Sequence, residues 1–140
     1  MDPVIDDDDP YRDPELYDIE YADMSEDVAY YQAIAWQADG PILELGCGTG
    51  RLTIPMADTG AHMVGVDLSE AMLAGCRAKL DALPPAGTVE LHHGEFRTFE
   101  LGRRFNTIIW PFNALHHLRT DEALDQALQR IAAHLEPGGM

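Results

Sequence analysis

The segment ILELGCGTGRL at residues 42–52 decides the fold of this 140-residue chain. Its first four residues, apolar except for Glu44, have the length of a short buried strand. Three alternating glycines follow in the stretch 46–50, called the glycine loop below. A tight turn and a close approach of backbone to ligand both favour glycine at such positions. We therefore expect strand 42–45 to run through the glycine loop into a helix over about 51–59.

Apolar and amphipathic segments alternate along the rest of the chain. Further strands are expected at 63–67, 89–92 and 105–110. Further helices are expected at 25–38, capped by Ser25, at 70–83, capped by Ser69, and at 121–135, capped by Thr120. Residues 16–21 are expected to form an ordered arm. Short apolar strands alternating with helices predict an α/β fold, a doubly wound parallel sheet with helices on both faces. The carboxyl ends of its strands share one rim, where such folds bind their ligands.

Composition indicates a single domain and excludes several classes of protein. The apolar content of 46% suits a real core, and no apolar run approaches the roughly 20 residues of a membrane helix. The formal charge of −16 argues against binding to nucleic acid. Residues 1–30 hold twelve acidic side chains and one arginine, so we expect residues 1–15 to be an acidic flexible tail and 16–140 to be the folded domain. A calcium site at Asp6–Asp9 is the alternative, but the spacing of an EF-hand loop is missing.

The cysteines and histidines do not suggest a metal site. Cys47 and Cys76 form no CxxC pair, which favours a reduced, cytoplasmic protein, and the N-terminus lacks the pattern of a signal peptide. His92-His93 and His116-His117 are adjacent pairs, whose rings on a strand point to opposite faces. A metal would need one histidine from each pair. A general base at His116 or His117 is the favoured alternative.

Charged residues around the glycine loop narrow the choice of ligand. Asp67 ends the second strand, 21 residues after Gly46, at the position of an acid that binds a ribose diol. Arg51 occupies the position where a dinucleotide-binding loop has its last glycine. Glu44 would repel a pyrophosphate but attract an amino or sulfonium group. The ligand implied is an adenosine that carries positive charge, and a nicotinamide-dependent dehydrogenase is disfavoured.

These residues carry a resemblance to a known family. ILELGCGTGRL (42–52) and VGVDLSEAML (64–73) closely resemble the first two motifs of class I S-adenosylmethionine-dependent methyltransferases, which have a Rossmann-like fold. HHGEF (92–96), PFNALHHL (111–118) and LEPGG (135–139) fall where that family has later landmarks. LYDIEY (16–21) resembles the aromatic N-terminal cap of its small-molecule branch. The resemblance implies S-adenosyl-L-methionine as cofactor, S-adenosyl-L-homocysteine as product, and direct displacement at the methyl carbon by a small-molecule acceptor.

The resemblance also implies roles for individual residues. Those expected at the methionine part, the ribose and the adenine are Glu44, Gly46, Cys47, Gly48, Gly50, Asp67, Leu68, Met72, Glu95 and Phe96. Those expected to border the methyl group and the acceptor are Trp110, Pro111 and Asn113. Those expected to close the site are Tyr17 and Tyr21, and the candidate catalytic bases are His116 and His117.

The resemblance further implies that the chain is incomplete. The family has seven strands, whereas this chain provides four, in the order 3-2-1-4, and is expected to be C-terminally truncated. Strand four should then be an open edge, which invites a homo-oligomer through pairing with a second copy. An alternative function is a catalytically incomplete cofactor-binding or assembly module that needs a partner chain.

Overall fold

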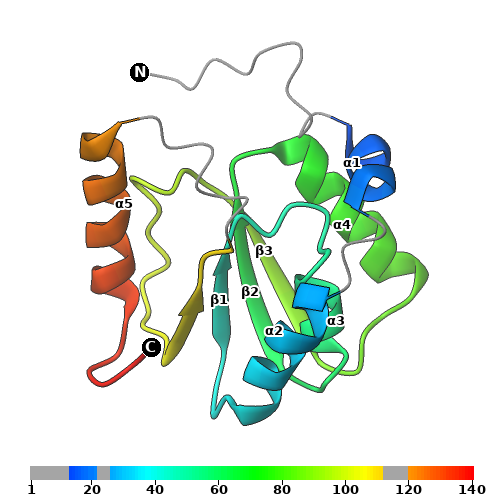
Figure 1. Cartoon of the computed structure of the whole chain (residues 1–140), viewed down its shortest axis with the longest axis horizontal. Helices are drawn as coiled ribbons and strands as arrows, with labels where there is room; N and C mark the ends of the chain where they lie inside the picture. Colours follow the sequence, from blue (N-terminus) through cyan, green and yellow to red (C-terminus); the bar gives the residue numbers. More distant parts are fainter. Residues whose placement is uncertain (1–12, 22–25, 112–119) are drawn as a thin grey trace.

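The computed structural model in Figure 1 describes residues 13–21, 26–111 and 120–140. Its centre is a four-stranded sheet of order β3-β2-β1-β4, in which every neighbouring pair is parallel. The strands are β1 (Ile42–Leu45), β2 (His62–Asp67), β3 (Thr88–His93) and β4 (Thr107–Ile109). This confirms the predicted fold class and strand order.

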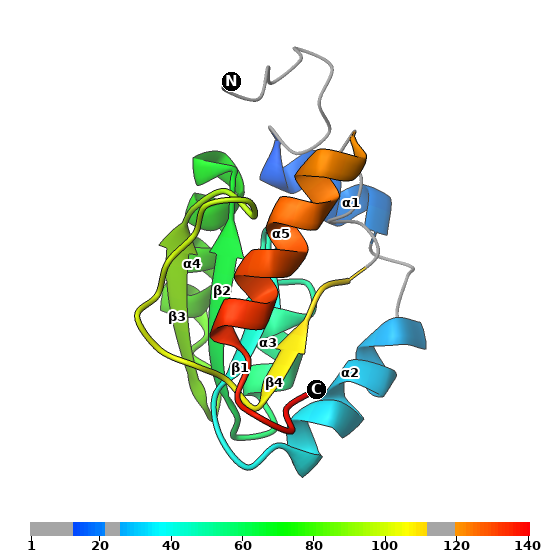
Figure 2. The same cartoon turned by 90° about the vertical axis from the view of Figure 1, so that its left-hand side faces the viewer.

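Five helices are described around this sheet. They are α1 (Pro14–Tyr21), α2 (Glu26–Gln37), α3 (Thr53–Ala57), α4 (Glu70–Ala82) and α5 (Asp121–His134). Figure 2 shows α5 on one face of the sheet and α2, α3 and α4 on the other, as expected for a doubly wound sheet. The helix predicted over about 51–59 is shorter, because Arg51 and Leu52 still belong to the turn that leaves the glycine loop.

Two of the three predicted helix caps are confirmed. The Ser69 hydroxyl accepts a hydrogen bond from the Met72 N–H at 3.2 Å, and the Thr120 hydroxyl accepts one from the Ala123 N–H at 3.0 Å. Each hydroxyl thus satisfies a backbone donor that the first helical turn leaves free. Ser25, the third predicted cap, lies outside the described residues.

The predicted arm at 16–21 is a helix, and it begins inside the stretch predicted as tail. Helix α1 starts at Pro14, where the Asp13 carboxylate accepts hydrogen bonds from the backbone N–H groups of Glu15 and Leu16 at 3.0 and 3.2 Å. An acidic cap followed by proline at the first helical position is a regular start signal. Asp13-Pro14-Glu15 carried this signal in the sequence. Residues 1–12 lie outside the described part of the chain.

The two faces of the sheet carry separate apolar clusters. The face toward α5 holds the buried residues Leu43, Leu45, Val64, Val66, Phe96, Phe99, Phe105 and Ala127. The opposite face holds Ala35, Ile42, Leu52, Met56, Ala57, Met63 and Ile109. Neighbouring residues of β1 thus face opposite sides, as the pleat of a strand requires. Glu44 consequently shares the face of α2 and α3, at the rim of the sheet.

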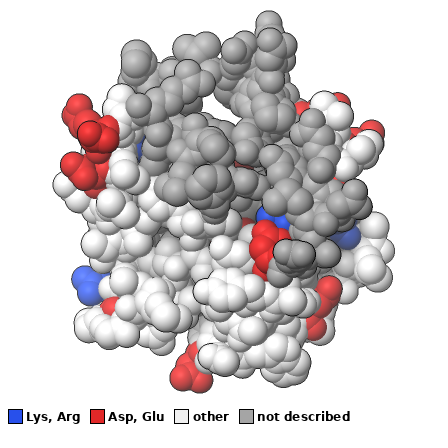
Figure 3. Space-filling model, viewed as in Figure 1, with Lys and Arg blue, Asp and Glu red and all other residues white. Residues whose placement is uncertain are grey.

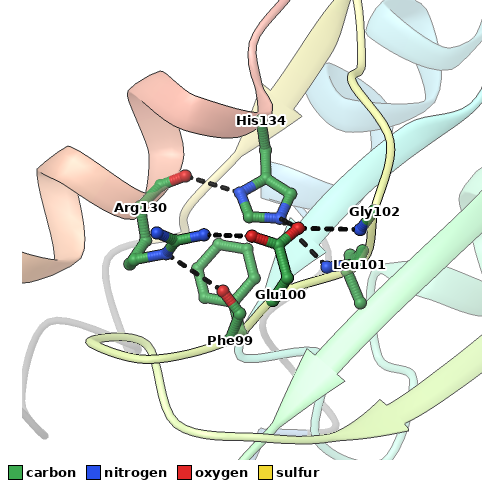
Figure 4. A network of polar contacts seen from close by, with 6 residues as sticks. All are labelled: Phe99, Glu100, Leu101, Gly102, Arg130 and His134. Carbon is green, nitrogen blue, oxygen red and sulfur yellow. Dashed lines mark hydrogen bonds and ion pairs between the residues drawn. The ribbon is translucent and has the colours of Figure 1, made fainter.

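A polar network ties α5 to the connection between β3 and β4 (Figure 4). The buried His134 ring contacts the Arg130 carbonyl through Nδ1 at 2.6 Å, and its Nε2 accepts from the Leu101 N–H at 3.1 Å. The same Nε2 lies 3.4 Å from the Glu100 carboxylate. Arg130 also donates to the Phe99 carbonyl and to the Glu100 carboxylate at 3.1 and 2.6 Å. These contacts fix the position of α5 relative to the connection between β3 and β4.

The prediction of an open edge at strand four is wrong for residues 105–108, which lead into β4 and form its first part. Phe105 forms a parallel bridge with Leu135, just after α5. Further along, the Met140 N–H donates to the Asn106 carbonyl at 2.8 Å, and the Ile108 N–H donates to the Met140 carbonyl at 2.9 Å. The turn after α5 brings the following residues back beside β4, so they satisfy backbone groups that would otherwise be exposed.

Candidate functional site

The glycine loop crosses from the end of β1 over the end of β2. The backbone N–H of Gly46 donates to the Val66 carbonyl at 2.7 Å, which holds the start of the loop against β2. Gly50 has a φ of +86°, and a Cβ there would lie 2.7 Å from the Cys76 sulfur. Gly48 has a φ of +55°, and a Cβ there would lie 3.3 Å from the Met72 side chain. The loop thus follows a path that residues with side chains rarely adopt, as predicted.

Glu44 is a fully buried carboxyl next to this loop. Its Oε1 accepts a hydrogen bond from the Thr53 hydroxyl at 2.5 Å, and its side chain is 2% exposed. Burial is the main cause that raises the pKa of Glu44 to about 7, and the nearby Asp67 raises it further. The Thr53 bond and Arg51 oppose this rise. The protonated and the ionised form of Glu44 are therefore both populated near neutral pH.

Asp67 joins the glycine loop to the start of α4. One carboxylate oxygen accepts from the Gly48 N–H at 2.8 Å, and the other accepts from the Ser69 N–H at 2.8 Å. These two bonds hold the carboxylate in one orientation at the end of β2. Asp67 is only partly buried. The carboxylate thus lies, oriented by backbone, at the position where the sequence predicts a ribose ligand.

The thiols beside the loop are protected rather than reactive. Cys47 is 4% exposed and Cys76 is fully buried. Burial raises the pKa of the Cys47 thiol well above its usual range, and it raises the pKa of Cys76 to about 11. A thiol must ionise to act as a nucleophile, so Cys47 serves the loop by packing. Gly65 of β2 provides the space for the Cys47 side chain, because a Cβ at position 65 would lie 2.7 Å from the Cys47 sulfur.

The structure places the other described candidates along the same rim. Leu68 follows Asp67 and is partly buried, whereas Met72 is 1% exposed and packs under the loop at Gly48. The Gly94 N–H donates to the Asp67 carbonyl at 3.0 Å, which brings the segment after β3 beside the end of β2.

The segments after β3 and β4 meet through their aromatic rings. Phe96 and Trp110 pack edge to face with ring centroids 5.8 Å apart, and Phe96 is only 4% exposed. The Glu95 carboxylate is paired with Arg97. Pro111 is buried, and the buried indole N–H of Trp110 has no hydrogen-bond partner among the residues described. Because its ring is buried against Trp110, Phe96 is part of the apolar cluster on the α5 face of the sheet.

Five candidates of the sequence analysis lie outside the described residues or side chains. Asn113, His116 and His117 lie outside the described residues. Tyr17 and Tyr21 belong to α1, but their side chains are outside the described part. Their roles stay predictions.

Sequence reasoning missed two carboxylates that hold the glycine loop from the N-terminal helices. Asp27 of α2 forms a bidentate pair with the Arg51 guanidinium at 2.9 and 2.8 Å, which lowers the pKa of Asp27. Asp18 of α1 accepts from the Thr49 hydroxyl at 2.7 Å. Such contacts join residues 24 and 31 positions apart, and no local pattern marks them.

Neither a metal-binding cluster nor a membrane-spanning helix occurs among the described residues. Nowhere in them do three or more His, Cys, Asp or Glu side chains form a group that could hold a metal ion. None of the described helices has the length and apolarity needed to cross a membrane.

The glycine loop, the strand-end Asp67 and the buried Glu44 on a 3-2-1-4 parallel sheet define a Rossmann-like ligand-binding domain. Comparison with known families makes the assignment narrower. The chain belongs to the methyltransferase domain family, since the model described as "Methyltransferase domain" matches residues 42–139. The resemblance of the first two motifs is thereby confirmed.

Individual relatives agree with this assignment. The chain is 40% identical over 100 residues to a dTDP-3-amino-3,6-dideoxy-alpha-D-glucopyranose N,N-dimethyltransferase of Streptomyces fradiae, covering 71% of this chain and 36% of the relative. It is 34% identical to the dTDP-3-amino-3,4,6-trideoxy-alpha-D-glucopyranose N,N-dimethyltransferase of Streptomyces venezuelae, over 86% of this chain and 48% of that enzyme. The chain thus spans half or less of the length of these two relatives.

Solved structures show the same relationship. The glycopeptide N-methyltransferase MtfA complexed with S-adenosyl-L-methionine superimposes with a TM-score of 0.75 at 30% identity. The match covers 85% of this chain and 53% of that structure. The similarity therefore extends beyond the residues of the family match.

Proposed function

We propose that this chain binds S-adenosyl-L-methionine and serves methyl transfer to an amine nitrogen of a small molecule. The observation that carries the proposal is the arrangement of Glu44, the glycine loop and Asp67 at one rim of the sheet. It supplies a buried carboxyl for a positive charge, backbone without side chains for close approach, and an oriented carboxylate for a ribose. The MtfA structure complexed with S-adenosyl-L-methionine supports the same ligand.

The residues present fit this cofactor. S-adenosyl-L-methionine, when bound, supplies a methyl group on a sulfonium sulfur, which needs no activation by the protein. Glu44 would hold the ammonium group, directly or through water, and Asp67 would accept from both ribose hydroxyls. The closely packed loop would exclude water and align the acceptor, and such alignment provides most of the rate in direct displacement.

The acceptor is proposed from the relatives and from charge. Both dimethyltransferases named above act, by their names, on dTDP-linked amino sugars, and MtfA is a glycopeptide N-methyltransferase. On the face drawn in Figure 3, acidic side chains stand over the N-terminal part of α5, whose first turn holds Asp121 and Glu122. A polyanionic acceptor such as nucleic acid would be repelled there. A proton leaves the amine on methylation, and His116 or His117 is the candidate base.

Calorimetric titration of the 140-residue chain with S-adenosyl-L-methionine tests the proposal. We expect binding by the wild type and a loss of at least about 10-fold for Asp67→Ala, because hydrogen bonds to a charged group contribute about 1.5–3 kcal/mol. Asp81→Ala, an exposed acid on α4, is the matched control and should bind as the wild type does. Unchanged affinity in Asp67→Ala with an intact circular dichroism spectrum, or tighter binding of NAD, would overturn the proposal.

Two further properties belong to the proposal. The free thiols of Cys47 and Cys76 support a cytoplasmic, reducing location.

Pairing with a second copy through β4 is restricted to the end of this strand, because the backbone groups of Asn106 and Ile108 are already bonded to Met140. Gel filtration tests this pairing, and a monomer at all concentrations would contradict it.

A further inference from the structure

Asp18 joins α1 to two elements of the candidate site. One carboxylate oxygen accepts from the hydroxyl of Thr49, in the middle of the glycine loop, at 2.7 Å. The other lies 2.8 Å from the Lys79 ammonium on α4. Thr49 is completely buried, whereas Asp18 and Lys79 are about one-third and two-fifths exposed. A single carboxylate therefore connects α1, the glycine loop and α4.

Helix α1 also comes unusually close to α4 at this place. Gly75 lies one turn before Lys79, and a Cβ on Gly75 would lie 2.7 Å from the Cβ of Pro14 and 3.6 Å from Cγ2 of Thr49. Because Gly75 of α4 has no side chain, Pro14 of α1 and Thr49 of the glycine loop can both pack against α4 at this position. Figures 1 and 2 show α1 beside α4, beyond the carboxyl ends of the strands.

Among the described side chains of α1, Asp18 and Pro14 make its contacts with the glycine loop and α4. Helix α1 has only eight residues, too few for a stable isolated helix. Two of its large apolar side chains face solvent, since Leu16 is 47% and Ile19 is 73% exposed. The polar contacts of Asp18 and the packing of Pro14 therefore both contribute to the position of α1. Helix α1 precedes residues 42–139, so the family match assigns it no role.

We infer that Asp18 is a positioning residue that holds α1 over the glycine loop and thereby slows release of the cofactor. The inference rests on the proposed function, because the loop must be the cofactor site. Coupling follows from the shared contact: a loop ordered by ligand offers Thr49 to Asp18 in a fixed position, and a docked α1 keeps the loop ordered. Such coupling is reciprocal, so ligand should stabilise α1 by the same factor by which α1 retains ligand.

Hydrogen exchange of the ligand-free chain tests the position of α1 without any cofactor. Amides of α1 should exchange about 10-fold faster in Asp18→Asn than in the wild type, which corresponds to about 1.4 kcal/mol for a charge-assisted hydrogen bond. Amides of α5 should be unchanged. Arg77→Met is the matched control on α4, the helix that carries Lys79. It removes the ion pair between Arg77 and Glu70, whose charged atoms are 3.7 Å apart and which does not involve α1.

Stopped-flow release of S-adenosyl-L-homocysteine tests the second half of the inference. Asp18→Asn should release this probe about 10-fold faster, whereas Lys79→Arg and Arg77→Met should keep the wild-type rate. The ion pair with Lys79 is partly exposed and is screened by salt. Release should therefore accelerate with sodium chloride in the wild type and do so less in Asp18→Asn, a response that a merely structural residue would not produce.

The outcomes separate this inference from the proposed function. Unchanged α1 exchange in Asp18→Asn, or faster exchange with an unchanged release rate, overturns the role of Asp18. No binding of S-adenosyl-L-homocysteine by the wild type overturns the proposed function and the retention of cofactor with it. Asp18 would in that case be assigned to the position of α1 alone, as judged by exchange.

Discussion

Replacing Glu44 by glutamine should remove a large part of the dependence of stability on pH. The pKa of this carboxyl is about 7 in the folded chain, against 4.5 for the unconstrained group. The protonated form is therefore favoured by folding, and its stabilising contribution is complete below pH 4.5 and is lost as the pH rises through 7. At about 1.36 kcal/mol per pH unit, the loss between pH 5 and pH 8 is about 2.5 kcal/mol. The glutamine side chain has no proton to lose, and it keeps an acceptor for Thr53.

Urea unfolding of both proteins at pH 5, 6.5 and 8 measures this effect. The free energy of unfolding of the wild type should fall relative to that of Glu44→Gln by about 2.5 kcal/mol from pH 5 to pH 8. Groups distant from Glu44 titrate alike in both proteins and cancel in the difference. Two pH profiles that run parallel would refute the reasoning, because Glu44 would then ionise as an ordinary carboxyl.

The same titration should govern binding of a cationic ligand. Only the ionised carboxyl attracts an ammonium group, and its population rises about 10-fold between pH 6 and pH 8 for a pKa of about 7. Affinity for S-adenosyl-L-methionine should rise by a similar factor in the wild type and stay flat in Glu44→Gln. A flat profile in both proteins would place the positive charge of the ligand away from Glu44.

Two further predictions concern the loop and the network beside α5. Gly50→Ala should cost about 2–4 kcal/mol, because the position has a positive φ and lies against Cys76, whereas Gly40→Ala, with no atom within 4 Å, should be nearly neutral. Equal melting temperatures would contradict this. His134→Phe should cost about 1–3 kcal/mol by leaving the Leu101 N–H unpaired, measured by urea unfolding. An unchanged midpoint would show that water replaces the ring nitrogen.

Local patterns in the sequence were sufficient for the framework of the site. Strand and helix periods predicted every strand in order, and the alternating glycines of the stretch 46–50 predicted the loop. Asp67 was placed by its distance along the chain from the loop, since a parallel sheet brings strand ends together regardless of what fills the core. Such features repeat over short separations, so one sequence is enough to show them.

The sequence by itself therefore determined the fold class and the glycine loop with its two carboxylates, Glu44 and Asp67, and the family resemblance that it carries implied the strand order. Only the tertiary structure decided which partners hold that loop: Thr53 on Glu44, and Asp18 on Thr49. It also decided that the segment after α5 pairs with β4. The physical reason is that single hydrogen bonds between distant residues depend on how helices pack, and the packing of α1 over the loop has no periodic signature in the chain.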